Sequence, residues 1–413
     1  MPNNSSAAAA ATATGEPESG YAWTRLLACV LIGTVGSVGM WSVVVALPAF
    51  QADFGVARGD ASLPYTLAMI GFAAGAVLMG SVADRWGISA SVKLGALMLA
   101  VGFAASAVAG NIWQFALVHL LIGFGSSASF APLIADISHW FDRRRGIAVA
   151  ISASGNYLGG AIWPPIVNWL IAGSGWRSTQ MVIAFVCLAT MVPLTLAMRR
   201  RVSAAGLAAA NGSRSSKEGT LGLSPHALMA LLALAGVGCC VAMSMPQVHI
   251  VAYCADLGYG PARGAEMLSA MLGFGIISRI ASGFIADRIG GLWTMLLGSM
   301  LQGVALLLYL MFDGLMSLYV VSALFGLFQG GIVPMYAIIV REYFPPQGSG
   351  TRVGILIMST IVGMALGGWM SGVIFDMTGS YWQAFANGLL WNLLNVTIVV
   401  FLLTRRGRVP AYA

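Results

Sequence analysis

Apolar runs long enough to cross a lipid bilayer recur along almost the whole chain. A helix rises about 1.5 Å per residue, so roughly 20 residues cover the hydrocarbon core. Hydrophobic residues make up 58% of the chain and charged residues only 8%, too few charges to cover a water-exposed surface. The runs are too long for barrel strands, and only helices or closed barrels satisfy the backbone in lipid. The sequence therefore predicts an all-α membrane protein.

The number of runs and the charges between them predict the topology. The runs lie at residues 25–49, 61–83, 91–110, 112–135, 146–171, 178–198, 226–253, 264–286, 292–312, 315–340, 352–375 and 381–404. Seventeen of the 21 Lys and Arg residues fall in segments that share a side with both termini, against Arg58, Arg177 and Arg263 opposite. Because basic residues concentrate on the cytoplasmic side, we predict twelve transmembrane helices in the cell membrane (the inner or plasma membrane), with both termini cytoplasmic.

Internal similarity divides the chain into two halves. The segment GSVADRWG at 80–87 recurs as GFIADRIG at 283–290, and the same offset of 203 residues relates Gly123–Phe141 to Gly326–Phe344. Such a repeat predicts two pseudo-symmetric six-helix bundles. The expected divisions are a disordered cytosolic tail at 1–22, an N-terminal bundle at 23–199, a cytosolic linker at 200–225, a C-terminal bundle at 226–404 and a cytosolic tail at 405–413.

Three motifs resemble those of a known family. The paired D-R-x-G turns, Asp84–Gly87 and Asp287–Gly290, resemble the signature of the major facilitator superfamily. Within it, Glu18–Trp23 resembles the motif that opens the monocarboxylate transporter family, and residues 140–150 are similar to that family's second motif. The resemblance implies the major facilitator fold and a small monocarboxylate as substrate, with the oxalate and formate exchangers as relatives. Since only two of the 21 basic residues are lysines, we expect a bacterial member.

The chain departs from the family pattern at three places. Animal members carry an acid one helical turn before the eighth-span arginine, where this chain has Gly275, and a first-span lysine, where it has Trp41. The related exchangers carry a lysine in the eleventh span, whereas here the span from Arg352 to Phe375 holds no charge beyond its first residue. The proton path of the animal proteins therefore cannot be transferred to this chain.

Arg279 is the one formal charge deep within a predicted span. Its nearest charges in sequence are Glu266 and Asp287, thirteen and eight residues away, and its repeat-related position is Ala76. An arginine at mid-bilayer costs about 2.5 to 3.5 kcal/mol and does not escape by deprotonating. Its guanidinium offers a two-pronged donor to one carboxylate, and a single buried cation favours monoanions. The alternative is an arginine satisfied by helix-end carbonyls or by cytosolic water.

Further polar residues complete the candidate site. His119 and His249 are proton-coupling candidates because histidine titrates near neutral pH, although each could instead bond a neighbouring helix. The candidate substrate-binding residues are Arg279, His119, Asn156, Tyr157, Gln247, Gln329 and Asn392, of which each amide could equally join two helices. The candidate cytosolic gate and motif residues are Asp84, Arg85, Gly87, Asp287, Arg288, Gly290, Arg143 and Arg144.

The sequence contains no pattern typical of an enzyme. The five cysteines lie in apolar segments without metal-ligand spacing, and the GxGxxG-like glycines fall inside spans. We expect no cofactor, metal or nucleic acid. The sequence favours a secondary active transporter of lactate- or pyruvate-like monocarboxylates, coupled to protons by symport and working by alternating access, with the substrate, the proton and membrane lipid as partners. The alternatives are a carboxylate exchanger of the oxalate/formate type and a non-transporting receptor or sensor.

Overall fold

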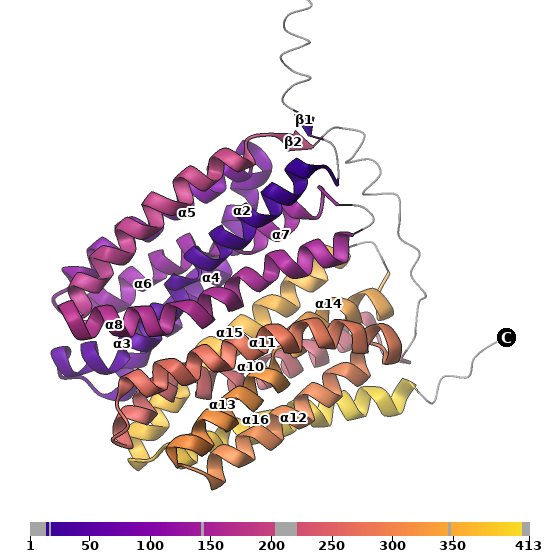
Figure 1. The fold of residues 1–413 in the computed structure, drawn as a ribbon. Coiled ribbons are helices and arrows are strands. Elements are labelled where there is room, and N and C mark those ends of the chain that lie inside the picture. The colour runs from indigo at the N-terminus through magenta and orange to yellow at the C-terminus, as the bar shows by residue number, and fades with distance from the viewer. Residues whose placement is uncertain (1–13, 16–17, 142–143, 203–220, 346–347, 407–413) are drawn as a thin grey trace, which may run out of the picture.

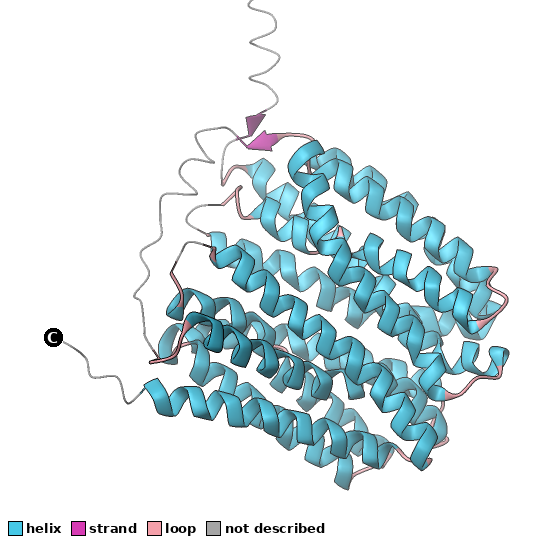
Figure 2. Ribbon diagram, turned by 180° about the vertical axis from the view of Figure 1, so that it is seen from behind, coloured by secondary structure: helices cyan, strands magenta, loops and turns pink. Residues whose placement is uncertain are grey.

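The computed structural model describes residues 14–15, 18–141, 144–202, 221–345 and 348–406. Helices account for nearly all the regular structure in these residues (Figure 2), which confirms the all-helical prediction. Most of the predicted N-terminal tail, the linker from 203 to 220 and the C-terminal tail after 406 lie outside the described residues. Arg143 lies outside them too.

Helices of the N-terminal half form one bundle, drawn in indigo to magenta in Figure 1. They are α2 (Gly20–Gly36), α3 (Val38–Phe54), α4 (Arg58–Trp86), α5 (Ile88–Ala107), α6 (Ile112–Ser127), α7 (Ala131–Ile137) and α8 (Arg145–Leu194), followed by the 3₁₀ helix η1 (Thr195–Met198). A short parallel pairing of β1 (Thr14–Gly15) with β2 (Arg201–Val202), which the sequence did not predict, joins the two ends of this half.

Helices of the C-terminal half form the second bundle, drawn in orange to yellow beside the first (Figure 1). They are α10 (Pro225–Asp256), α11 (Pro261–Ile289), α12 (Gly291–Met311), α13 (Leu315–Gln329), α14 (Ile332–Tyr343), α15 (Ser349–Thr378) and α16 (Tyr381–Arg406). The bundles meet where α4 packs on α15 and α8 packs on α11. We call this interface the seam. The end of the molecule that carries Gly20 and Arg406 is the termini end, and the opposite end is the distal end.

Eleven segments of the described chain are long and apolar enough to cross a membrane. The longest, Gly146–Met198, contains two of the predicted runs in 53 residues. Within it Gly175 has φ 79° and ψ 163°, a conformation outside the helical region that interrupts α8. The predicted fifth and sixth runs both lie within this one segment, so the count of twelve crossings stays a prediction.

Glycines permit close helix contacts that recur in both halves. A methyl group on Gly123 would overlap the carbonyl oxygen of Ala68, and one on Gly326 would overlap the carbonyl oxygen of Met271. Both pairs therefore bring one helix backbone directly against another, which only a residue without a side chain allows. Helix breaks follow each glycine, between α6 and α7 and between α13 and α14.

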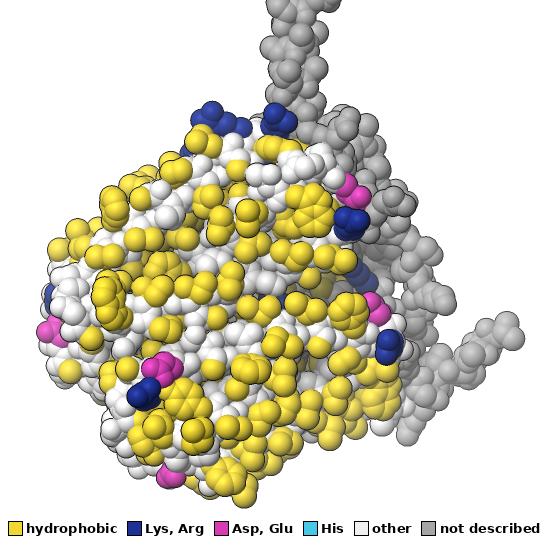
Figure 3. Space-filling view, in the orientation of Figure 1, with side chains coloured by type: hydrophobic (Ala, Val, Ile, Leu, Met, Phe, Trp, Pro, Cys, Tyr) yellow, Lys and Arg dark blue, Asp and Glu magenta, His cyan; other side chains and the backbone are white. Residues whose placement is uncertain are grey.

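The surface supports a membrane location. Figure 3 shows apolar side chains spread over most of one face, with basic and acidic side chains gathered toward its margins. Large apolar residues such as Trp169, Phe185 and Phe284 are exposed at 73%, 73% and 70%, which would be costly against water over so wide an area. The chain is therefore a multi-pass membrane protein.

Candidate functional site

Arg279 lies at the seam, half-buried on α11. Its guanidinium carbon is 4.2 Å from the centre of the Tyr157 ring on α8, and its Nε donates at 3.4 Å to the carbonyl oxygen of Gly330, in the break between α13 and α14. No carboxylate oxygen of the described residues lies within 4.0 Å of the guanidinium. A guanidinium has five N–H donors, and one long hydrogen bond leaves most of them available.

Gly275 explains how Tyr157 reaches Arg279. Gly275 lies one helical turn before the arginine, and a methyl group there would be 2.5 Å from Cε1 and 2.8 Å from Cδ1 of Tyr157. The ring, 8% exposed, therefore fills the space beside the bare α11 backbone. An aromatic ring from the opposite bundle thus occupies the place where the resemblance leads us to expect an acid. Tyr157 stabilises the cation through its π face without neutralising it.

Two other buried side chains with unpaired polar atoms lie on segments that neighbour this pair. Gln329 immediately precedes Gly330, and both polar atoms of its buried amide lack a hydrogen-bond partner among the described residues. The buried indole N–H of Trp41 also lacks one, and a methyl group on Gly160, one turn from Tyr157 on α8, would lie 2.9 Å from it. Unpaired buried polar atoms are costly, so they mark places where a polar ligand would be favourable.

The two candidate histidines have different surroundings. His119 is buried in α6, where its Nδ1 lies 2.7 Å from the carbonyl oxygen of Phe115, and its Nε2 has no partner among the described residues. His249 is buried on α10 and joins two other helices: its Nε2 lies 2.8 Å from the carbonyl oxygen of Gly368 on α15, and its Nδ1 lies 3.1 Å from the hydroxyl of Tyr381 on α16. Only His249 of the two bonds to groups outside its own helix.

The remaining candidate amides are spread through the bundles. Asn392 donates at 3.1 Å to the carbonyl oxygen of Ser299, so it joins α16 to α12 inside the C-terminal half. Asn156 is buried on α8 and Gln247 on α10, and both of these helices pack on α11. The structure therefore brings Tyr157 to Arg279, places Gln329 next in the chain to Gly330, whose carbonyl accepts from Arg279, and leaves Asn392 with a helix-joining contact.

The two D-R-x-G turns adopt the same backbone at the termini end. Gly87 has φ 90° and ψ 159°, and Gly290 has φ 87° and ψ 164°, values that are essentially restricted to glycine. The acidic and basic residues of both turns are exposed: Asp84, Arg85, Asp287 and Arg288. Glycine is thus required by the turn itself, and the charges are left free to face water or headgroups.

The other two motifs pack against each other at the same end. The ring of Tyr21 lies 5.2 Å from that of Trp140, and the ring of Trp23 lies 5.0 Å from that of Phe141. The backbone N–H of Arg144 donates at 2.9 Å to a carboxylate oxygen of Glu18. Segments far apart in the sequence therefore form a single structural unit at the start of α2 and α8.

A family model confirms the resemblance. The model described as Major Facilitator Superfamily matches residues 29–312 and 250–412. The chain belongs to the major facilitator superfamily. Monocarboxylate transporter 13 of Bos taurus is 26% identical over 388 residues, covering 89% of this chain and 86% of that protein. Monocarboxylate transporter 11 of Homo sapiens is 25% identical over 388 residues, covering 90% and 80%.

Solved structures of transporters share the fold of this chain. A mutant of the nucleoside transporter NupG superposes with a TM-score of 0.71 at 15% identity, covering 92% of this chain and 99% of that one. A bacterial homolog of the human lysosomal transporter Spinster, in an inward-facing and unoccupied conformation, gives 0.67 at 14% identity, covering 94% and 96%. At such identities the likeness concerns the fold alone.

Sequence reasoning assigned no role in the site to Arg58, which lies at the distal end of the seam. We counted it only as a marker of topology, yet it is 7% exposed and pairs with Asp256 of the other bundle. A signal was available in the acids near the ends of the seventh and eleventh runs, Asp256 and Asp376, since a buried arginine at a span boundary needs a partner.

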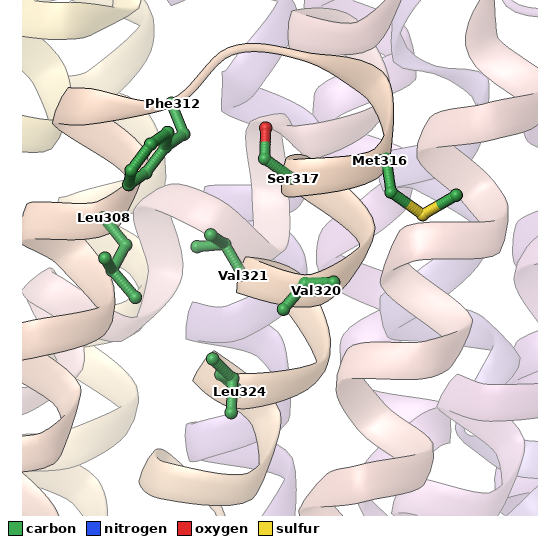
Figure 4. Close-up of a pocket in the computed structure, with 7 residues that line it drawn as sticks. All are labelled: Leu308, Phe312, Met316, Ser317, Val320, Val321 and Leu324. Atoms are coloured by element: carbon green, nitrogen blue, oxygen red, sulfur yellow. The ribbon is translucent and has the colours of Figure 1, made fainter.

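An apolar hollow on the protein surface lies apart from Arg279 and Arg58. It measures about 390 Å³ between α12 and α13, and Leu308, Phe312 and Val320 are among its lining side chains (Figure 4). No charged side chain lines it. It therefore offers no cation to pair with a carboxylate.

Proposed function

We propose that this chain is a proton-coupled symporter of small monocarboxylates of the lactate or pyruvate type, working by alternating access. The observation that carries the proposal is the setting of Arg279: a half-buried cation at the seam with no carboxylate of the described residues within 4.0 Å. Such a charge is favourable only when an anion or water satisfies it. A substrate carboxylate that comes and goes meets this requirement.

The surroundings of Arg279 support a monoanion. The ring of Tyr157 covers one side of the guanidinium at 4.2 Å, and Arg279 is the one formal charge that the sequence places deep within a span. One carboxylate binds the guanidinium fork, while the Gln329 amide and the Trp41 indole N–H offer hydrogen bonds to a keto or hydroxyl oxygen. Asn156 and Gln247, on the helices beside α11, are further candidates for contact.

Alternating access requires two bundles that rock about the site, and the chain supports this division. We infer two pseudo-symmetric bundles of six spans, at 23–199 and 226–404, with the interruption at Gly175 separating the fifth and sixth spans. The matching backbone contacts of Gly123 and Gly326 support the repeat. We place the termini end in the cytoplasm and the distal end outside the cell membrane, as the distribution of basic residues favours.

A proton accompanies the anion in this proposal. A monoanion bound to Arg279 and a proton bound to a histidine cross together when the loaded carrier reorients, and both are released on the other side before the empty carrier returns. His119 and His249 are the candidates for the residue that binds this proton.

The test is uptake of labelled lactate into proteoliposomes, with and without an inward proton gradient. We expect the gradient to stimulate uptake, and Arg279→Ala to abolish it while the protein remains folded. Gly283→Ala on the same helix is the matched control, because a methyl group there meets nothing within 4 Å. Wild-type uptake by Arg279→Ala would contradict the anchoring role. Indifference to the gradient, together with strong stimulation by internal substrate, would identify an exchanger.

A further inference from the structure

At the distal end, one arginine of the N-terminal bundle is held by two helices of the other bundle. Arg58 begins α4, and its Nη1 lies 2.6 Å from the Tyr381 hydroxyl and 3.1 Å from Oδ2 of Asp256. Its Nη2 lies 3.2 Å from Oδ1 of Asp256, and its guanidinium carbon is 4.7 Å from the centre of the Phe375 ring. This side chain therefore bridges α4 to the ends of α10 and α16.

A second contact of the same turn also crosses the seam. The backbone N–H groups of Arg58 and Gly59 donate to the two carboxylate oxygens of Asp376 on α15, at 2.8 and 2.6 Å. No side chain of α4 caps the start of its own helix. The cap comes from the opposite bundle, where a carboxylate is stabilised by the first N–H groups and by the helix dipole. Separating the bundles would expose both the cap and the arginine.

The hydrogen bonds behind Arg58 have a fixed direction. The carbonyl oxygen of Gly368 only accepts, so Nε2 of His249, 2.8 Å away, carries the hydrogen. In a neutral imidazole Nδ1 is then an acceptor, and the Tyr381 hydroxyl, 3.1 Å away, donates to it. That leaves the Tyr381 oxygen to accept from Arg58. The chain from Arg58 through Tyr381 to His249 is therefore complete only while His249 is neutral.

We propose that Arg58, Asp256, Asp376, Tyr381 and His249 form a distal latch that closes the outer side of the seam, and that His249 releases it when it binds a proton. A proton taken up at Nδ1 from the outer solution makes both ring nitrogens donors, so the Tyr381 hydrogen loses its acceptor. It also places a second positive charge behind Tyr381, facing Arg58. The latch rests on the proposed alternating access, but it does not depend on which solute is carried.

The charged groups around His249 support this assignment. Arg58 on α4 and Asp376 on α15 are the charged groups that act on it, and Tyr381 on α16 separates it from Arg58. Two further charged pairs lie at the distal end, on or beside α3, α8 and α11. Asp53 on α3 pairs with Arg177 at 3.0 Å. On α11, Glu266 pairs with Arg263 at 3.1 Å and accepts from Tyr319.

The experiment measures the separation of the bundles at the distal end, without any substrate. Spin labels at Ala52→Cys on α3 and Ala262→Cys on α11 report it, since both positions are exposed and the five native cysteines are buried. In reconstituted full-length protein we expect a short distance at pH 7.5. At pH 5 we expect the population to shift toward a longer distance, by roughly tenfold in the open-to-closed ratio, as loss of a charge-assisted hydrogen bond would produce.

Variants separate the latch from other sources of pH dependence. His249→Gln keeps a donor for Gly368 and an acceptor for Tyr381 but does not titrate, so it should stay closed at both pH values. Tyr381→Phe and Arg58→Ala should open at both. His226→Gln is the matched control, an exposed histidine at the start of α10 with no role in the site, and should respond like the unmodified chain.

Three results would overturn the proposal. They are a distance that does not change with pH in the unmodified chain, a full pH response in His249→Gln, and a closed distribution in both Arg58→Ala and Tyr381→Phe. A pH response lost in His119→Gln and kept in His249→Gln would assign proton sensing to the other histidine and would equally refute the latch. Because no substrate is used, failure of lactate transport leaves these outcomes unaffected.

Discussion

A methyl group on Gly275 should disconnect Tyr157 from Arg279. In Gly275→Ala the new carbon would lie 2.5 Å from Cε1 and 2.8 Å from Cδ1 of the ring. Unstrained carbon atoms stay about 3.5 Å or more apart, so the ring must retreat by roughly 1 Å. Tyr157 is 8% exposed and packed between helices, so the ring has to turn or the bundles have to separate locally. Either change removes the ring from its position 4.2 Å from the guanidinium carbon.

The expected loss follows from the cation–π contact. Such contacts contribute about 0.5 to 2 kcal/mol, which corresponds to a fall of about 2- to 30-fold in kcat/KM for an anion held by the same arginine. Initial rates of labelled-lactate uptake into proteoliposomes, normalised to the amount of reconstituted protein, measure it. Gly283→Ala should transport like the unmodified chain, because its methyl group meets nothing within 4 Å.

A double-mutant cycle isolates the mechanism. Tyr157→Ala removes the ring that the methyl group meets, so adding Gly275→Ala to it should lower uptake by less than about twofold further. If Gly275→Ala transports like the unmodified chain, the ring does not orient the arginine. If its loss is equally large with and without Tyr157, Gly275 acts through another contact. Either result would refute the reasoning.

Three further substitutions test the remaining contacts. Arg279→Lys keeps the charge but loses the planar fork, so KM for lactate should rise about tenfold, and an unchanged KM would exclude two-pronged binding. Gly326→Ala overlaps a facing backbone carbonyl, so little folded protein should remain in size-exclusion profiles, unlike Gly283→Ala. Arg25, 2% exposed, bonds Asp136 twice at 2.7 Å. Arg25→Leu should cost about 3 to 5 kcal/mol and lower the melting temperature, whereas adding Asp136→Leu should restore most of it. Equal melting temperatures for the single and double variants would argue against an unpaired buried charge.

The sequence predicts the helices because each run carries its own signal. Apolar length sets the spans, and glycine marks turns such as those at Gly87 and Gly290, where φ is near 90°. Contacts between helices carry no comparable signal. Nothing in the residues around Gly326 indicates that this glycine rests on the backbone at Met271, because which helix faces which is decided by packing of the whole bundle.

The difference between signals within one run and contacts between helices also explains which parts of the site were predicted. Arg279 was found because a charge within an apolar run is conspicuous, and Tyr157 was named because it lies near mid-span. Their pairing through the bare backbone of Gly275 depends on the crossing of α8 and α11, which the residues alone do not define. Arg58 was missed because arginine is common at the ends of spans. Only the folded chain reveals that it is buried against Asp256 and Tyr381.

The two arginines of the seam have opposite electrostatic needs, and this difference fits their proposed roles. Arg58 pairs with Asp256 and Tyr381, although its buried Nε has no partner among the described residues. Both partners belong to the other bundle, and the side chain of Asp256 remains 36% exposed. A pair of this kind adds little net stability, because the desolvation cost offsets most of the attraction and water is close enough to replace either partner. Such a contact can be broken in every cycle at small cost. Arg279 pairs with no carboxylate of the described residues, so a bound anion improves its environment in any state that admits one. A carrier of anions requires two elements at its seam: an ion pair between the bundles that can separate, as at Arg58, and a cation that is available to bind the anion, as at Arg279.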